Sequence, residues 1–329
     1  MSKVNKEAYL CLAAMLRARE GKALNQEKAE RMLTASREEA AHILTECGYA
    51  DFSALPDKEI DAALGEHLEN AFAELERMLP EGKLLDVFRL RYDYHNVKTL
   101  LKAEAMGTQA SSMLSRCGTV DPRDLKHAYR EENWLALRRP LASALQEGKE
   151  LLARTGNPQT VDFMLDRLCY EEMLALANEV GSEFLGDYLR LQIDCRNCAS
   201  TVRVMRMKKS TDLLREALLD GGSIEKERFL VSDANELGEL CRRTSLAPLA
   251  ETCEKAVHGG TMTAFELACD NLQNAYLQKA KAVAYGEEPV VVYLCCLEKE
   301  ITAVRMILTG KRAGVAPEVL RERMRDFYA

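Results

Sequence analysis

The chain has 329 residues, 29% of which are charged, with a formal net charge of −7 and a pI of about 5.5. This acidic balance disfavours an extended nucleic-acid surface, because binding to phosphates relies on clustered Lys and Arg. Leu, Ala, Glu and Arg dominate, whereas aromatic residues make up 6% and prolines number eight. Such a composition favours helices, so we expect an almost entirely α-helical fold.

The chain carries no sequence signal for membrane insertion or secretion. Its two longest apolar stretches, residues 8–16 and Val290 to Leu297, have nine and eight residues, far fewer than the roughly 20 that cross a bilayer. An apolar run over 8–16 follows Glu7 and precedes Arg17, without a small-residue cleavage site, so it is interpreted as a first helix. The 11 cysteines, an odd and scattered number, fit reduced core thiols better than a disulfide framework. We therefore expect a cytoplasmic protein.

In chain order, apolar residues recur at spacings of three and four, which predicts helices of about 12 to 25 residues. Two Ser/Thr-x-x-Glu sequences, Ser36 with Glu39 and Thr263 with Glu266, predict helix starts with reciprocal caps. Thr119 or Asp121 is expected to cap a third helix. Gly and Pro predict breaks at residues 48–56, 80–82, 118–122, 156–158, 221–223, 259–263, 286–289 and 310–317.

One short pattern occurs three times along the chain. The copies are Leu90, Asp93, Asn96, Val97; Leu191, Asp194, Asn197, Cys198; and Leu297, Glu300, Ala303, Val304. The acids lie 101 and 106 residues apart (194 − 93 and 300 − 194), which is the length of a domain rather than of a solenoid unit. Three similar modules can close around a central axis.

Blocks on both sides of the pattern also match in the same order. Downstream, the four residues from Gly118 match the four from Gly222 at an offset of 104, and Gly314 with Val315 is a weaker match. We predict three helical modules with pseudo-threefold symmetry, forming a funnel with a central cavity. Their predicted bounds are 1–116, 117–220 and 221–329.

The repeated polar residues are Asp93, Asn96, Asp194, Asn197 and Glu300. Asp and Asn are poor residues for a helix interior, so their recurrence there requires a tertiary contact. The spacing places them beside the apolar stripe, where a carboxylate needs donors from a neighbouring helix start or from the repeated Gly–Thr/Ser turn. We interpret them as a structural clamp in each module, and the alternative is an acid/base or metal site built on the three acids.

Basic residues follow each acid and number nine: Lys98, Lys102, Arg203, Arg206, Lys208, Lys209, Arg305, Lys311 and Arg312. The simpler interpretation is a solvated helix face with carboxylates nearby. The more specific one is a basic ring that docks an acidic partner.

Motifs for catalysis and cofactor binding do not appear in this sequence. Cys195 and Cys198 have CxxC spacing but lack a second pair at zinc-site spacing, so they are interpreted as core thiols. The five histidines show no paired-ligand spacing, and Gly310 with Lys311 lacks the rest of a phosphate-binding loop. We expect no catalytic residue, cofactor, bound metal or nucleotide.

Several stretches resemble the C subunit of V-type and archaeal-type rotary ATPases, whose eukaryotic counterpart is the d subunit. They are Arg89 to Gly107, Arg190 to Lys209, Gly222 to Ile224, Glu288 to Arg305 and Arg312 to Tyr328. The sequence departs from the family where Ala303 replaces the usual Asn and where cysteines enter the second motif. The likeness runs through all three predicted modules.

This resemblance implies a non-catalytic connector, or socket, on the cytoplasmic side of the membrane. Its implied partners are the D and F subunits of the central stalk and the membrane proteolipid rotor ring, with one copy per complex and a monomer in isolation. Such a part would couple ion transport to ATP synthesis or hydrolysis. Two alternatives remain: a cytoplasmic triplicated helical scaffold unrelated to rotary motors, and a helical-bundle enzyme that uses Asp93, Asp194 or Glu300 with a buried metal.

Overall fold

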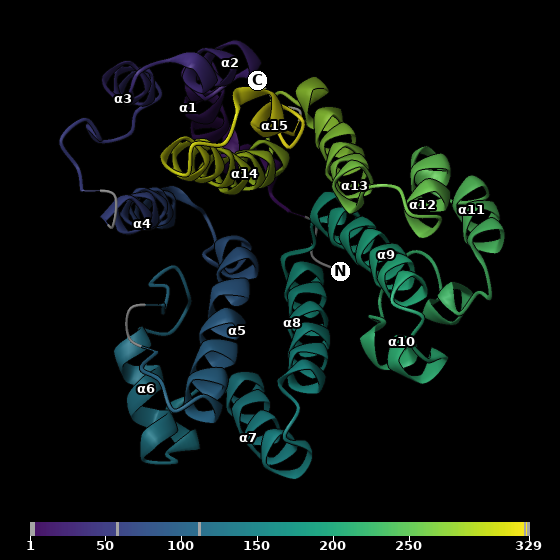
Figure 1. Cartoon of the computed structure of the whole chain (residues 1–329). Helices are drawn as coiled ribbons and strands as arrows, with labels where there is room; N and C mark the ends of the chain where they lie inside the picture. Colours follow the sequence, from purple (N-terminus) through teal and green to yellow (C-terminus); the bar gives the residue numbers. More distant parts are fainter. Residues whose placement is uncertain (1–3, 57–58, 111–112, 326, 328–329) are drawn as a thin grey trace. The chain divides into compact units, whose positions relative to one another are not determined.

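The computed structural model describes residues 4–56, 59–110, 113–325 and 327, and all regular secondary structure among them is helical (Figure 1). The predicted all-α class is therefore confirmed, whereas the pseudo-threefold funnel stays a prediction. Tyr328, which the resemblance includes, lies outside the described residues. Within the described ranges, no helix combines the length and the apolarity that a membrane span requires.

The described residues form two compact units. One, the central unit, comprises residues 81–260, and the other, the terminal unit, combines the described residues of 4–80 with those of 261–327. The module bounds predicted at 116/117 and 220/221 fall inside the central unit, and the division into three modules remains a prediction. The terminal unit joins the two ends of the chain, which the predicted modules do not anticipate.

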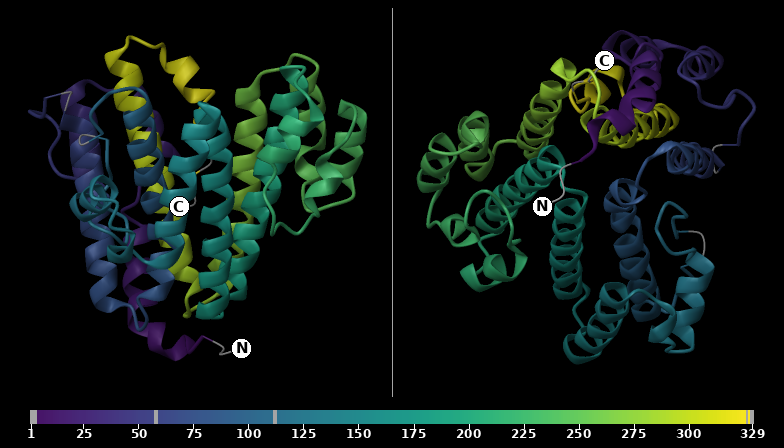
Figure 2. Two further views of the ribbon diagram at one scale, coloured as in Figure 1. Left: turned by 90° about the horizontal axis from the view of Figure 1, so that it is seen from below. Right: turned by 180° about the vertical axis from the view of Figure 1, so that it is seen from behind.

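The central unit is organised around three long helices that lie side by side in Figures 1 and 2, with α8 between α5 and α9. Along α5, Lys98 pairs with Asp166 of α8 at 2.8 Å, and Lys102 pairs with Asp162 at 2.7 Å. The residue numbers of the α8 partners thus decrease as those on α5 increase. The two helices are therefore antiparallel. The helices of this unit are α5 (Lys83–Ala105), α6 (Pro122–Arg130), η3 (Trp134–Ala136), α7 (Arg139–Thr155), α8 (Pro158–Val180), α9 (Glu183–Arg206), α10 (Thr211–Ala217), η4 (Lys226–Phe229), α11 (Ala234–Arg242), η5 (Ala247–Leu249) and α12 (Ala250–Val257).

The terminal unit packs around one long helix, α14, which contacts α1, α2, α4 and α15. The first half of α14 is apolar on all sides, and Val290, Val291 and Val292 are all buried there, as expected of a helix surrounded by others. The helices of this unit are η1 (Lys6–Tyr9), α1 (Leu10–Glu20), α2 (Gln26–Thr34), α3 (Arg37–Glu46), α4 (Ile60–Met78), α13 (Met262–Leu277), η6 (Gln278–Ala282), α14 (Glu288–Arg312) and α15 (Pro317–Arg321).

Helix starts test the predicted caps. The Ser36 capping box with Glu39 is present at α3, so that prediction is confirmed. Thr263 is wrong as a cap, because α13 begins two residues earlier and the side chain of Thr261 accepts from the Ala264 N–H at 3.3 Å. Asp121 caps α6. Several helices, including α10 and α15, are shorter than the predicted 12 residues.

Candidate functional site

The fully buried carboxylate of Asp93, in the middle of α5, binds the turn that precedes α6. It accepts hydrogen bonds from the backbone N–H groups of Thr119 at 3.0 Å and Val120 at 3.2 Å, and from the Thr119 hydroxyl at 2.5 Å. Arg138, at the start of α7, adds an ion pair at 3.1 Å and also pairs with Glu172 of α8. One acid therefore joins the start of α6, the start of α7 and the α5–α8 pair.

The buried amides of Asn96 and Asn197 each bind one backbone residue through two hydrogen bonds. The Asn96 Nδ2 group donates to the Ser115 carbonyl at 2.8 Å, and the Ser115 N–H donates to Asn96 Oδ1 at 2.8 Å. Asn197 repeats this geometry with Leu219, at 2.9 Å and 2.8 Å. A side-chain amide that matches both polar groups of a backbone residue fixes the path of that segment.

Asp194, in α9, accepts from the equivalent turn but without a cationic partner in the contacts described. The N–H groups of Ser223 and Ile224 donate to its carboxylate at 3.1 Å and 3.2 Å. Burial raises the pKa of Asp194 to about 6, although these two backbone hydrogen bonds oppose the shift. The second clamp thus has the geometry of the first and a less well compensated charge.

Glu300 of α14 accepts from the beginning of the chain. The Leu24 N–H donates to its Oε2 atom at 3.2 Å, and Leu24 precedes Asn25, the cap of α2. Val120 stands in the same relation to Asp121, the cap of α6. Burial raises the pKa of Glu300, so the third acid also lies in a low-dielectric environment beside a helix start.

Glycine at the two repeated turns leaves space for the acids. A Cβ atom on Gly118 would lie 2.3 Å from Asp93 Oδ1, and one on Gly222 would lie 2.2 Å from Asp194 Oδ1. Any larger residue would therefore displace the carboxylate. The glycine of the repeated Gly–Thr/Ser sequence is thus explained in both turns by the lack of space for a side chain.

The three motif helices also end in the same way. In each, the residue 14 positions after the acid has a positive φ: 63° at Gly107, 50° at Lys208 and 68° at Gly314. The next residue donates to a carbonyl five positions back, in the pairs Thr108 with Ala103, Lys209 with Val204 and Val315 with Gly310. This is a Schellman ending. The predicted match of Gly314 with Gly118 is therefore wrong, because Gly314 ends α14 as Gly107 ends α5.

Helices α5 and α9 also touch through matching positions. The Arg91 guanidinium donates to the Gln192 side-chain oxygen at 3.4 Å, and each residue stands two positions before the acid of its own helix.

Most of the predicted basic residues are engaged within their own unit. Besides the two lysines paired with α8, Arg206 donates to the carbonyls of Ala256 and Gly260. In the terminal unit, Arg305 pairs with Asp61 at 2.7 Å, and Lys311 donates to the carbonyls of Leu33 and Ala35. Arg203 and Arg312 lie exposed in the last turns of α9 and α14, and Lys208 and Lys209 lie exposed just beyond α9.

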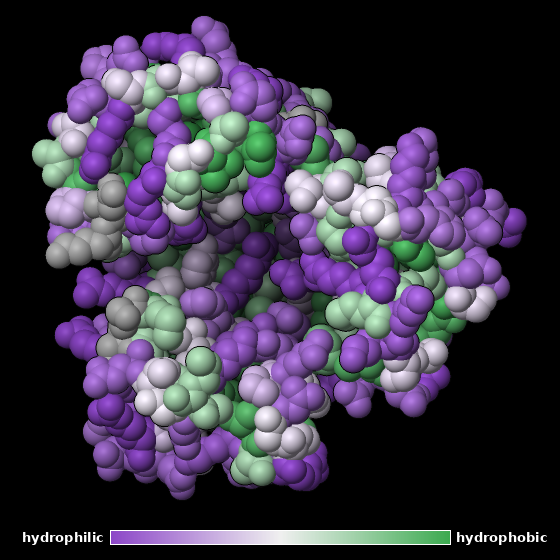
Figure 3. Space-filling view, viewed as in Figure 1, coloured by the Kyte–Doolittle hydropathy of each residue, from purple (hydrophilic) through white to green (hydrophobic). Residues whose placement is uncertain are grey.

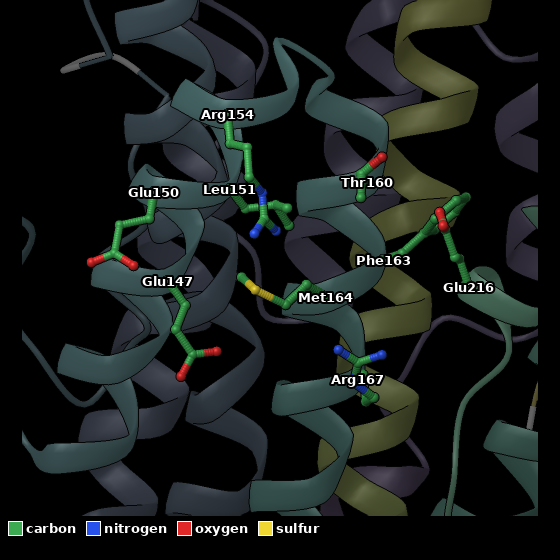
Figure 4. A pocket seen from close by; sticks show the side chains of 9 residues that line it. All are labelled: Glu147, Glu150, Leu151, Arg154, Thr160, Phe163, Met164, Arg167 and Glu216. Atoms are coloured by element: carbon green, nitrogen blue, oxygen red, sulfur yellow. The ribbon is translucent and has the colours of Figure 1, made fainter.

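Hydrophilic side chains are spread over both units on the face shown in Figure 3. A pocket of about 590 Å³ lies in the central unit beside α7 and α8. Figure 4 shows Arg154 reaching from α7 toward α8, with Met164 below it and Glu147 on the α7 side. The nine lining residues mix three glutamates, two arginines and a threonine with apolar groups.

Three buried cysteines meet where sequence reasoning did not expect a site. Cys198, in the second motif, lies close to Cys241 of α11 and Cys253 of α12, whereas Cys195 is buried one turn earlier on α9. The CxxC spacing pairs Cys198 with Cys195, whereas no spacing rule links Cys198 to Cys241 or Cys253. Only the packing of α9 on α12 brings them together.

Together these residues define a class: an all-helical protein in which long helices are fixed through buried acids to the starts of their neighbours. A family model described as the ATP synthase (C/AC39) subunit matches residues 12–323. The chain therefore belongs to this C/AC39 family, and the resemblance identified from the residues is confirmed.

Curated relatives of nearly equal length support the same assignment. The chain is 25% identical to the C subunit of the V-type sodium ATPase of Enterococcus hirae, over 97% of this chain and 99% of the relative. It is 27% identical to the C subunit of the V-type ATP synthase of Thermus thermophilus, over 93% and 94%. It is also 25% identical to the C subunit of the A-type ATP synthase of Haloquadratum walsbyi, over 94% and 96%.

Proposed function

We propose that this chain is the non-catalytic central-stalk connector of a V/A-type rotary ATPase or ATP synthase. In this role it couples the D and F subunits of the stalk to the membrane proteolipid ring, as a peripheral cytoplasmic component present in one copy. Membership of the C/AC39 family supports the complex. The observation that carries the connector role is the use of Asp93, Asp194 and Glu300 as clamps on helix starts.

These clamps argue against chemistry at the acids. Each carboxylate is buried away from solvent and accepts at least one hydrogen bond from a backbone N–H inside the fold. General acid/base work or metal-assisted hydrolysis needs a group that reaches substrate or solvent. We therefore assign the three acids an architectural role.

The same contacts suit a part that transmits torque. A coupling element must deform little under load, which favours closely packed helices held at several points along their length. Helices α5, α9 and α14 are each held near the middle by an acid and closed at the end by a Schellman turn. We propose that three such modules surround the stalk, in the funnel that the repeat predicts.

The C-terminal ends of α5 and α9 are the docking surface that we favour. Met106 and Met207 occupy matching positions there, and they are 72% and 51% exposed. Methionine is an adaptable contact residue at binding surfaces, and the neighbouring Lys208 and Lys209 supply positive charge for an acidic partner. The engaged basic residues, Lys98, Lys102, Arg206, Arg305 and Lys311, are better explained as internal contacts.

Co-purification tests this proposal. A tagged chain expressed in its native host should recover the D and F subunits and the proteolipid ring. Recovery of none of them would overturn the connector role and favour the scaffold unrelated to rotary motors.

Charge reversal tests the docking surface separately. Lys208→Glu with Lys209→Glu should weaken recovery of the complex in a salt-dependent manner. Arg130→Glu is the matched control, because Arg130 is an exposed basic residue in the last turn of α6 in the same unit. Equal recovery with both variants would remove this surface from the proposal while leaving the connector role in place.

A further inference from the structure

Three sulfur atoms from three helices converge inside the central unit. Cys198 of α9 lies 3.8 Å from Cys241 of α11, and Cys241 lies 3.9 Å from Cys253 of α12, measured between Sγ atoms. The three Sγ atoms all lie within 4.8 Å of one another, and the three residues are fully buried. Residues 43 and 12 positions apart have thus been brought to one point by the packing of α9, α11 and α12.

These separations match those of a metal-bound thiolate cluster. With metal–sulfur distances of about 2.3 Å, tetrahedral ligands lie roughly 3.8 Å apart and trigonal ones roughly 4.0 Å apart. The sulfurs therefore require only small side-chain adjustments to share one ion. Thiolates select soft ions such as Zn²⁺ and Cu(I) over hard ones.

Packing alone does not account for sulfur at this position. The residues that match Cys198 in the other two motifs are Val97 and Val304, and all three side chains are fully buried. An aliphatic residue therefore satisfies the core at two of the three positions. The cysteine is specific to the copy in which two further cysteines face it.

The surroundings favour a thiolate at one of the three positions. Cys253 lies in the first turn of α12, where the helix dipole favours negative charge. The Ala250 carbonyl, 3.1 Å from Cys253 Sγ, accepts from the thiol in its protonated form.

We propose that Cys198, Cys241 and Cys253 form a binding site for one thiophilic metal ion, Zn²⁺ or Cu(I). Each thiol that becomes a ligand releases its proton to solvent, and no oxidation or reduction takes place. Three sulfurs complete a trigonal Cu(I) site, whereas Zn²⁺ takes a fourth ligand, and Cys195 is the other buried thiol of α9. The bound ion joins α9 to the α11–α12 pair and stabilises the central unit.

Metal titration of the intact chain tests the site. The reduced, chelator-treated protein is titrated with Zn²⁺, with Cu(I), and with Co²⁺ as a spectroscopic probe of thiolate ligation. We expect one equivalent of the preferred ion to bind and to raise the thermal midpoint, and Co²⁺ to give a thiolate-to-metal charge-transfer band. Release of protons on binding would accompany these signals.

Two variants and a matched control locate the ion. Cys198→Val, which reproduces the residue of the other motifs, and Cys253→Ala should both abolish the charge-transfer band. Cys169→Ala should retain it, because Cys169 is a buried cysteine of the same unit that contacts Met173 instead. Cys195→Ala should weaken Zn²⁺ binding and leave Cu(I) binding unchanged.

Two results would overturn the proposal: no stoichiometric binding of either ion by the intact chain, or equal binding by Cys198→Val. If a variant fails to fold, X-ray absorption of the zinc-loaded natural chain decides instead. A shell of three or four sulfurs at about 2.3 Å supports the site. A shell dominated by nitrogen and oxygen places the ion elsewhere and rejects it.

Discussion

The backbone N–H of Leu24 donates to Glu300 across 3.2 Å, although the two residues are 276 positions apart. Helix α14 carries a buried acid that needs donors, and the loop between α1 and α2 supplies one of them. Residues from the start and the end of the chain thus pack together in the terminal unit. The terminal unit is therefore built from two separate parts of the sequence, whereas the central unit, residues 81–260, is one continuous part.

Fragments should reflect that difference. We expect residues 81–260 to fold alone with a cooperative thermal transition, because their long helices pack on one another. Residues 261–329 should remain largely unfolded alone, since α14 would expose the face that α1, α2 and α4 cover. Circular dichroism of the separate fragments and of 261–329 mixed with 1–80 measures this. A fully helical, cooperative 261–329 fragment would contradict the expectation.

Alanine at the clamp glycines should destabilise the fold. In Gly118→Ala and Gly222→Ala the new Cβ would displace a buried carboxylate from its backbone donors, at a cost of roughly 2 to 4 kcal/mol. Gly65→Ala is the control, because Gly65 lies inside α4 with open space around its Cβ position, and it should gain roughly 0.5 to 1 kcal/mol. Urea unfolding of the three variants measures the differences, and equal effects would remove the steric argument.

The pH dependence of stability should carry the signature of Asp194. Its folded pKa of about 6 lies above the ordinary value of 3.8, so between these values the folded state holds a proton that the unfolded state has lost. The contribution of Asp194 to the free energy of unfolding therefore falls as pH rises from about 4 to 6, by roughly 3 kcal/mol, and is constant above that window.

The variant Asp194→Asn isolates this contribution. Its stability relative to the natural chain should rise by up to roughly 3 kcal/mol between pH 4 and pH 6.5. Urea unfolding at a series of pH values measures the difference. A difference that stays constant across the series would show that Asp194 does not titrate in this window.

The two aspartates should respond differently to the same substitution. Asp93→Asn loses the ion pair with Arg138 and leaves that cation with one carboxylate fewer, so at pH 7.5 it should cost roughly 2 to 4 kcal/mol. Asp194→Asn should cost less than about 1 kcal/mol, because its lost hydrogen bond is offset by removal of a poorly compensated charge. Thermal or urea unfolding of both variants measures this, and the reverse order would reject the role assigned to Arg138.

Several features could be predicted because they are local. Helix content, the capping box at Ser36 and the repeat with its acids are encoded within a few residues or in direct self-similarity. The family followed from the same motifs. The start of α13 could not be fixed from the sequence, because Thr261 and Thr263 offer equivalent hydroxyls and the structure uses Thr261 as the cap.

The sequence by itself determined that this protein is helical, repeats one motif and belongs to the C/AC39 family. Only the tertiary structure decided that Leu24 serves Glu300, that Arg138 compensates Asp93 but not Asp194, and that three cysteines meet. The physical reason is the range of the interactions. Propensity and capping act over a few residues, whereas a buried polar group is satisfied by whichever donor the packed helices bring to it, however distant in the chain.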